Sequence, residues 1–340
     1  MIDLRSDNVA GAAPEIVESL VRATTGTQPS YGADAWTDRL QTVFSDVFEH
    51  DCFVQPTLTG TATNALALAL LTPAWGAVCC TDMAHIFDSE CGAGEMFTGG
   101  AKIVPLPQTD GRLSAEVLER YLAKAARAGT AVAPPKALSL TEATERGTLY
   151  NLDQVAELSA VAKGHGLSVH MDGARFSNAV AALGCSPADV TWRAGVDVLS
   201  FGATKNGALA AEAVVVFDEA HAEALRYRAR KAGQVLSKMR FVSAQLEAYL
   251  ADDLWLNLAR HANRMAARLA DGLAATRGAS LLYEVQINEI FASIDNRLGN
   301  ALRANDVGVF DRGDGEIRMV TAFSNTPEQI DSVIAILHNA

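Results

Sequence analysis

One lysine in this chain stands where nucleophilic chemistry is favoured. Lys205 lies among small residues, in the sequence GATKNG at 202–207, directly after residues 196–201, which are apolar and typical of a buried strand. A lysine at the end of a strand, with its stem partly removed from water, is suited to act as a nucleophilic amine. Lys205 is therefore a candidate for an imine-forming lysine, although a solvated surface lysine is the ordinary interpretation of such a turn.

An aspartate ends another strand-like stretch upstream. Residues 167–172 read LSVHMD, and Gly173 follows Asp172. Open α/β sheets place ligand-contacting groups at the carboxyl ends of their strands. A carboxylate beside an imine-forming lysine is the pair that pyridoxal phosphate requires, because the acid keeps the pyridine nitrogen protonated and the ring can then accept electrons. The alternative for Asp172 is an N-cap of the helical stretch 174–183.

A turn of small residues completes this set. The sequence LTGTATN at 58–64 precedes the apolar helical stretch 65–71, so Gly60 and Thr61 lie at a helix start. Backbone N–H groups and hydroxyls at such a start bind phosphate. The turn matches neither the Walker loop nor the dinucleotide glycine pattern. It predicts a phosphate cup, with an ordinary N-cap as the alternative.

The order of these motifs resembles the low-specificity L-threonine aldolases, which include phenylserine aldolase. The resemblance covers nearly the whole chain, through LRSDN at 4–8, SYG at 30–32, TGT at 59–61, AHI at 84–86, HMDGAR at 170–175 and Lys205. It implies an α/β fold of the aspartate-aminotransferase type (fold type I), with a three-layer, mostly parallel seven-stranded sheet and a smaller C-terminal α/β domain. It also implies retro-aldol cleavage of L-threonine, L-allo-threonine or phenylserine-like substrates to glycine and an aldehyde.

The resemblance assigns roles to further residues. His85 would lie on the pyridine ring and, itself or through a water, act as the base. Arg318 would bind the α-carboxylate, for which a guanidinium offers a bidentate fork. His170, on the same strand face as Asp172, would support that acid. The remaining expected contacts are Ser6, Tyr31 and Arg175 at the substrate or cofactor, and Lys238 or Arg240 at the phosphate of a neighbouring chain.

One segment departs from the family pattern. Many threonine aldolases carry a second histidine in a Glu-Asn-Thr-His segment, whereas residues 141–147 read TEATERG and place a glutamate there. The wall facing the β-substituent therefore differs, and the β-carbon stereochemistry and aldehyde preference stay open. Glu90 and Glu145 become second candidates for the base.

Composition limits the class of protein. The 340 residues are 49% hydrophobic and 20% charged, which is ordinary for a soluble enzyme, and the net charge of −12 argues against a nucleic-acid partner. Five cysteines without metal-ligand spacing fit a reducing cytoplasm, and no metal is expected. No apolar run approaches the roughly 18 residues of a membrane span. We expect a cytoplasmic homodimer or homotetramer, with its sites at the dimer interface and a small amino acid as substrate.

The elements that position these residues follow from alternating apolar stretches. Residues 1–35 are expected to form a segment contributing to the site and the interface, 36–250 a large cofactor-binding domain, and 251–340 a small domain. The strand at 212–217 begins too soon after Lys205 for a helical crossover, so it should run antiparallel. Further strands are expected near 52–58, 77–81, 101–106, 136–141, 167–172, 196–201, 280–294 and 308–320.

Three rival functions remain at this stage. A β-eliminating lyase or an aminotransferase on the same fold would use the same lysine and aspartate. A catalytically silent pyridoxal-binding module would not need both residues intact. A nucleotide-binding dehydrogenase requires a glycine-rich dinucleotide turn, which the chain lacks.

Overall fold

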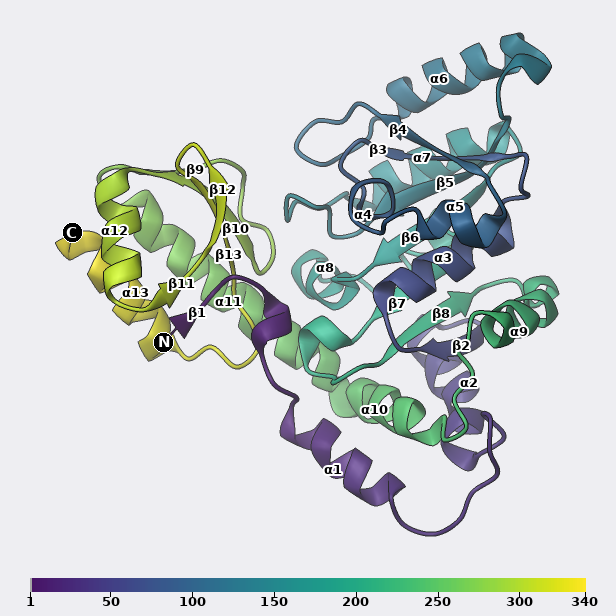
Figure 1. The fold of residues 1–340 in the computed structure, drawn as a ribbon, viewed down its shortest axis with the longest axis horizontal. Helices are drawn as coiled ribbons and strands as arrows, with labels where there is room; N and C mark the ends of the chain where they lie inside the picture. The colour runs from purple at the N-terminus through teal and green to yellow at the C-terminus, as the bar shows by residue number, and fades with distance from the viewer. Residues whose placement is uncertain (1) are drawn as a thin grey trace.

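The computed structural model describes residues 2–340 and contains a large sheet domain and a smaller α/β unit (Figure 1). The large sheet has seven strands in the order β2-β8-β7-β6-β5-β3-β4. Strand β8 is antiparallel to both of its neighbours, and the other strands are parallel to one another. The predicted sheet and its one reversed strand are confirmed. The strands are β2 Phe53–Thr57, β3 Ala77–Thr81, β4 Lys102–Leu106, β5 Pro135–Thr141, β6 Ser168–Gly173, β7 Val198–Gly202 and β8 Glu212–Val216.

Helices cover both faces of this sheet, which explains why its central strands β6 and β7 are almost entirely buried. Successive residues of β7 alternate between the two cores, since Leu199 and Phe201 pack on one face and Val198 on the other. The first face carries α2 Ala35–Phe48, α6 Ala115–Ala128, α7 Leu152–Gly164, α8 Phe176–Leu183 and α10 Arg240–Leu250. The second carries α3 Gly60–Leu71, α4 His85–Asp88, α5 Ala93–Thr98 and α9 Ala222–Lys231.

Aromatic packing fixes the end of β7, from which Lys205 follows. The ring of Phe201 meets Phe44 edge-on at 5.2 Å between centroids, and it also contacts Phe48 and Phe176. Truncating a buried phenylalanine of this kind to alanine costs about 3–5 kcal/mol. These aromatic contacts fix the carboxyl end of β7 on the face that packs against the core. The opposite face of this strand end is directed to the site.

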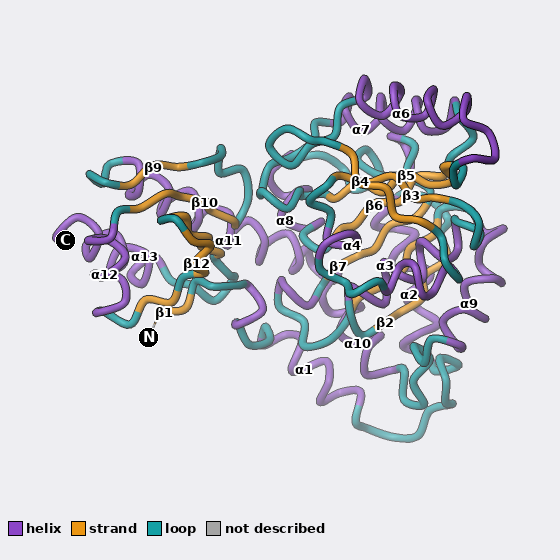
Figure 2. Tube along the Cα trace, turned by 45° about the horizontal axis from the view of Figure 1, so that its top comes forward, coloured by secondary structure: helices purple, strands orange, loops and turns teal. Residues whose placement is uncertain are grey.

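The smaller unit is a four-stranded antiparallel sheet in the order β12-β13-β10-β9. The N-terminal strand β1 (Ile2–Asp3) pairs with β11 (Val307–Gly308), and Leu4 enters this core, so Figures 1 and 2 show both ends of the chain in the same unit. The other elements are β9 Ala279–Leu281, β10 Glu289–Ile294, β12 Phe310–Gly313 and β13 Glu316–Val320, with α12 Asn296–Ala304 and α13 Pro327–Asn339.

Two expected strands of this unit are divided. The stretch expected near 280–294 is β9 and β10 separated by a loop, and the stretch near 308–320 is β11, β12 and β13. A tight turn causes one division, because Gly313, Asp314 and Gly315 all have positive φ between β12 and β13.

One helix joins the units, while α1 (Pro14–Ala23) packs on α10 of the large unit. Helix α11 (Leu254–Ala274) contributes Trp255 to the large core and Met265, Leu269 and Leu273 to the small one. Helix α11 therefore belongs to both cores. The expected domain boundary between residues 250 and 251 stays a prediction.

Candidate active site

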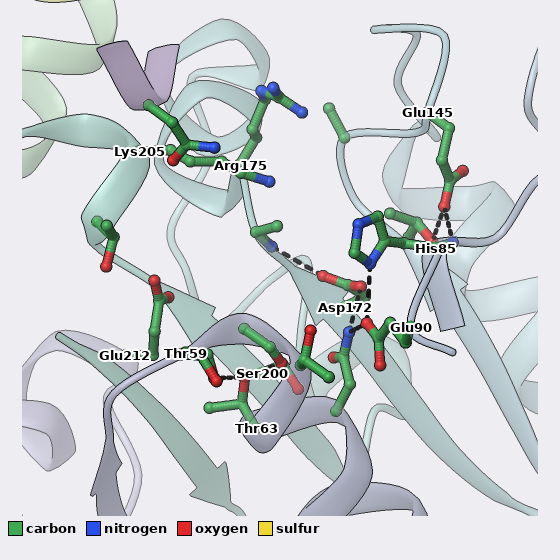
Figure 3. A pocket seen from close by; sticks show the side chains of 18 of the residues that line it. Thr59, Thr63, His85, Glu90, Glu145, Asp172, Arg175, Ser200, Lys205 and Glu212 are labelled. Atoms are coloured by element: carbon green, nitrogen blue, oxygen red, sulfur yellow. Dashed lines mark hydrogen bonds and ion pairs between the residues drawn. The ribbon is translucent and has the colours of Figure 1, made fainter. Parts of the chain in front are cut away.

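A cavity of about 330 Å³ lies at the carboxyl ends of the central strands (Figure 3). It brings together residues that are far apart in the sequence and come from α3, α4, β6 and the turn after β7. Most residues expected to bind the cofactor line it, and they are Gly60, Thr61, His85, Asp172, Arg175 and Lys205. This position is where open α/β sheets bind ligands.

The start of α3 forms the part of the cavity suited to phosphate. The Thr59 side chain caps the helix by accepting the Ala62 N–H at 3.2 Å. A Cβ atom at Gly60 would meet no other atom within 4 Å, so a ligand can approach the backbone there. The helix has 12 residues, and its N-terminus favours an anion. The hydroxyls of Ser200 and Thr204 line the same cavity.

Asp172 is buried and held by two donors. Its Oδ1 accepts the Ala174 N–H at 3.0 Å, and its Oδ2 accepts Nδ2 of Asn64 at 2.7 Å. Helix α8 begins only at Phe176 and has no side-chain cap. The alternative interpretation of Asp172 as the N-cap of that helix is therefore wrong, and its carboxylate is directed to the cavity wall.

His85 opens the short helix α4 and is held at two points. Its backbone N–H donates to Oε1 of Glu145 at 3.1 Å, and its Nδ1 lies 2.9 Å from Oε1 of Glu90. The hydrogen bond to Glu90 raises the pKa of His85, against the lowering effect of burial. Its side chain keeps 49% exposure, so the imidazole is open to the cavity.

His170 links neighbouring strands of the sheet through side-chain hydrogen bonds. Its ring nitrogens bond the hydroxyls of Ser139 and Ser200, each at 2.9 Å, and burial lowers its pKa to about 4. It is thus neutral and joins β5, β6 and β7. It contacts the cavity through Ser200 rather than through a hydrogen bond to Asp172.

The turn that carries Lys205 is fixed by its neighbours. The Asn206 amide donates to the Tyr249 hydroxyl at 2.7 Å and to the Trp255 carbonyl at 2.8 Å. Gly207 has φ 113°, and a Cβ there would lie 2.8 Å from Leu258. This φ favours glycine, and a Cβ would also crowd the Leu258 side chain of α11. The turn directs the partly buried Lys205 to the cavity.

A buried ionic cluster lies beside Lys205 where the two units meet. Arg175 donates from Nε and Nη2 to Asp7 at 2.8 and 3.1 Å, and its Nη1 lies 3.2 Å from Glu289. Although burial alone would raise it, the charges of Arg175 and Lys205 hold the pKa of Asp7 below its ordinary value. Arg318 adjoins the cluster, with its Nη1 3.9 Å from Glu289.

A family model described as "Beta-eliminating lyase" matches residues 3–297. The chain belongs to the beta-eliminating lyase family. The chain is 42% identical over 327 residues to a "Low specificity L-threonine aldolase" of Pseudomonas aeruginosa, covering 96% of this chain and 94% of that protein. It is 29% identical over 185 residues to a protein of the same name from Saccharomyces cerevisiae, covering 54% and 46%.

Solved structures agree with the family. A threonine aldolase of Leishmania major superposes with a TM-score of 0.93 at 27% identity, covering 100% of this chain and 99% of that one. A serine palmitoyltransferase of Sphingomonas wittichii, at 18% identity and a TM-score of 0.73 over 99% and 86% of the two chains, shares the fold. The predicted resemblance and fold class are confirmed.

Ser6, Arg318 and Tyr31, which we expected to contact the substrate or the cofactor, do not line the cavity. Ser6 caps the turn 7–9 by accepting the Asn8 N–H at 3.2 Å, and Nη2 of Arg318 donates to the Arg5 carbonyl at 3.1 Å. Tyr31 is 52% exposed and donates its N–H to the Ser237 carbonyl. Lys238 and Arg240, which we expected at the phosphate of a neighbouring chain, also lie outside this chain's cavity, with Lys238 exposed and Arg240 at the start of α10.

Sequence reasoning assigned no role to several residues that line the cavity. Asn64 lies three residues after Thr61, one helical turn along the same face of α3. Glu212 is a charge at the start of the apolar strand β8, opposite Gly202, and burial raises its pKa to about 7. Helical spacing identifies the first, and a charge inside an apolar run identifies the second.

The structure also bears on metal ligands and on the membrane. Among residues 2–340, no group of three or more His, Cys, Asp or Glu side chains is placed to hold a metal ion. None of the helices in that part of the chain combines the length and the apolar character needed to cross a membrane.

Proposed function

We propose that this chain is a pyridoxal 5′-phosphate-dependent carbon–carbon lyase that cleaves L-β-hydroxy-α-amino acids to glycine and an aldehyde. One observation carries the proposal: Lys205, Asp172 and the N-terminus of α3 line a single cavity. The similarity to low-specificity L-threonine aldolases over nearly the whole chain supports the reaction class. Its substrates are L-threonine, L-allo-threonine and phenylserine-like amino acids.

The residues present fit this cofactor. The open backbone at Gly60 and the hydroxyl of Thr61 would hold the phosphate, Asp172 the pyridine nitrogen and Lys205 the reactive carbon, with His85 on the ring face. When bound, the cofactor supplies an electron sink for the bond that breaks. Asn64 and the Ala174 N–H keep the Asp172 carboxylate oriented, so the acid is in place before any ligand enters.

The arginines at the junction would hold the substrate carboxylate. Arg175 already contacts two carboxylates, Asp7 and Glu289, whereas Nε of Arg318 is buried without a partner. Arg318 lies outside the cavity lining and its Nη2 donates to the Arg5 carbonyl at 3.1 Å, but its Nε is a donor without a partner at the junction. We therefore assign it the carboxylate, with support from Ser6 and from Arg175, which lines the cavity. Fixing the carboxylate orients the Cα–Cβ bond relative to the ring, which is the geometric condition for breaking that bond.

His85, or a water that it holds, would accept the proton of the β-hydroxyl. It is the histidine that lines the cavity, and its ring is open to it. Glu145 keeps the His85 backbone in place through the 3.1 Å hydrogen bond. Glu145, in the segment that differs from the family pattern, thus supports the position of the base, and Glu145 itself also lines the cavity.

A second copy of the chain would complete the site. Tyr31, Lys238 and Arg240 lie close together but outside this chain's cavity, and the Nε of Arg240 is buried without a partner. A basic group is still required at the phosphate, because the cavity's lining offers only hydroxyls and backbone near Gly60. We propose a homodimer or homotetramer in which this cluster faces the neighbour's cavity. The five free cysteines support a cytoplasmic location.

The experiment that tests the function is product analysis. Purified protein loaded with pyridoxal phosphate is incubated with L-threonine or phenylserine, and glycine and the matching aldehyde are quantified. Equal amounts of the two products support retro-aldol cleavage. Keto acid with ammonia would instead indicate the β-eliminating alternative, and an aminated cofactor with stoichiometric keto acid would indicate an aminotransferase.

A further inference from the structure

Four polar side chains from separate segments form one hydrogen-bonded chain along the cavity (Figure 3). Oδ2 of Asp172 accepts from Nδ2 of Asn64 at 2.7 Å, and the same nitrogen donates to Oε1 of Glu90 at 2.8 Å. Nδ1 of His85 lies 2.9 Å from that glutamate oxygen. Asn64 and Glu90 are both buried. Neither residue holds the cofactor or the substrate in the proposed function.

The positions of these four side chains determine which atom donates in each hydrogen bond. The amide nitrogen of Asn64 lies between two carboxyl groups, so it gives one proton to each and both groups accept. Oε1 of Glu90 is then an acceptor toward His85 as well, and Nδ1 of His85 carries the proton. In the neutral imidazole this leaves the lone pair on Nε2, where a substrate proton can be received.

Packing stability does not explain these two residues. Oε2 of Glu90 and Oδ1 of Asn64 are both buried without a hydrogen-bond partner. Buried polar atoms without partners destabilise a fold, and an apolar side chain of similar volume would avoid that cost. A carboxyl group at position 90 that lines the cavity and contacts His85 therefore indicates a role in the chemistry rather than in packing.

We propose that Glu90 is a positioning residue that makes His85 a base, and that Asn64 ties this pair to Asp172. The inference rests on the proposed function, since it gives His85 the β-hydroxyl proton. That proton moves to Nε2 of His85, the O–H electron pair forms the carbonyl of the leaving aldehyde, and the Cα–Cβ pair stays with the glycine carbon. Glu90 remains an acceptor throughout and stabilises the imidazolium that forms.

The charged groups around His85 set the expected pH dependence. Glu90 and Asp172 raise the pKa of His85, whereas burial and the charge of Lys205 lower it, and Glu145 contacts its backbone. The imidazole of His85 must be neutral to accept a proton. Activity should therefore rise with pH as the His85 imidazolium loses its proton. Removing the negative charge of Glu90 lowers the pKa of His85, and the rise should therefore move to lower pH.

The test is Glu90→Gln, which keeps the shape and an acceptor oxygen but removes the charge. The titration of His85 is followed by NMR in the cofactor-free protein, and the pH profile of kcat/KM in the loaded enzyme. We expect both midpoints to move to lower pH and the plateau to fall roughly tenfold or more, since the weaker base is less well oriented. Circular dichroism and the melting temperature confirm that the variant is folded.

Glu119→Gln is the matched control. Glu119 lies 3.0 Å from Nε2 of His165, so the same substitution removes the same kind of pair away from the cavity. It should leave His85 and the pH profile unchanged. Unmoved His85 titration in Glu90→Gln would overturn the inference. A wild-type enzyme that releases no aldehyde would instead overturn the proposed function, and the NMR titration separates the two failures.

Discussion

Asp7 and Arg175 form a buried ion pair that ties the N-terminal segment to the end of strand β6. Their two hydrogen bonds measure 2.8 and 3.1 Å, and the side chains are 1% and 12% exposed. The pair lies where the two units meet, beside the residues proposed to hold the substrate. It therefore couples the stability of the junction to the geometry of the site.

Replacing Asp7 with alanine should strongly destabilise the protein. The substitution leaves the buried Arg175 with Glu289 alone, and removing one partner of a buried pair costs about 3–5 kcal/mol. Urea denaturation measures the change in the free energy of unfolding. Asp331→Ala is the control, because Asp331 pairs with Arg268 while both are about half exposed, at 50% and 49%, and its loss should cost under about 1 kcal/mol. Equal costs for the two variants would contradict the assignment of Asp7 as a buried anchor.

Two buried glutamates predict a loss of stability as the pH rises. Burial raises the pKa of Glu145 and of Glu212 to about 7, whereas an unfolded glutamate titrates near about 4.3. The folded protein thus holds more protons between these values, and the free energy of unfolding falls as the pH rises through this window. Glu145→Gln and Glu212→Gln should each flatten this part of the curve in the cofactor-free protein.

Urea denaturation at several pH values checks this expectation. The control is Glu116→Gln, which changes an exposed glutamate that pairs only with Arg120 across one helical turn. Its slope against pH should match that of the wild type. If all three variants give the wild-type slope, Glu145 and Glu212 are not the source of the pH dependence.

Arg318→Ala should raise KM and lower kcat together. The substitution removes a charge-assisted contact worth about 1.5–3 kcal/mol, which corresponds to roughly a 10- to 100-fold change in kcat/KM, and misalignment of the breaking bond lowers the rate as well. Steady-state kinetics with L-threonine measure both constants. Arg312→Ala, on the neighbouring strand β12, is the control, because Arg312 is exposed and should be dispensable. Wild-type values of kcat and KM in Arg318→Ala would show that another residue binds the substrate carboxylate.

The cluster of Tyr31, Lys238 and Arg240 predicts complementation between chains. A variant with both Lys238→Ala and Arg240→Ala should retain the cofactor less well, because the neighbour's phosphate loses its basic group. Mixed with a Lys205→Ala variant, it should recover part of the activity, since a hybrid dimer holds one intact site. Activity is measured after the two variants are unfolded together and refolded. Absence of any recovery would indicate that each site is built within one chain.

The sequence predicted the large sheet well because most of its strands contain short apolar runs that alternate with helical stretches. Strand β3 matches its expected bounds, and Lys205 and Asp172 were found because strand ends expose the residues that follow them. Glu212 and Asn64 received no role, because neither the charge in an apolar run nor the helical spacing shows from the sequence that the side chain reaches the cavity. The loop before Asn288 could not be anticipated, because it is determined by distant contacts: the Asn288 amide donates to Asp7 at 3.1 Å and to the Thr321 carbonyl at 2.8 Å.

The placement of Tyr31, Lys238 and Arg240 illustrates another limit. The resemblance expects Lys238 or Arg240 at the phosphate of a neighbouring chain, but it does not indicate that Tyr31 lies beside them, outside the cavity of its own chain. Arg175 shows the same point, because the helix expected at 174–183 begins only at Phe176 and the Arg175 side chain donates to Asp7, which is distant in the sequence. Physical contacts between distant segments decide both positions.

The central claim is that Lys205 holds the cofactor, and borohydride reduction tests it most directly. The loaded enzyme should show a visible absorbance band that disappears on reduction, and peptide mass mapping should then find the pyridoxyl group on Lys205. The Lys205→Ala variant should show neither the band nor turnover, while Lys163→Ala, which removes an exposed lysine paired with Asp197, should behave as the wild type. Label on any lysine other than Lys205 would contradict the account.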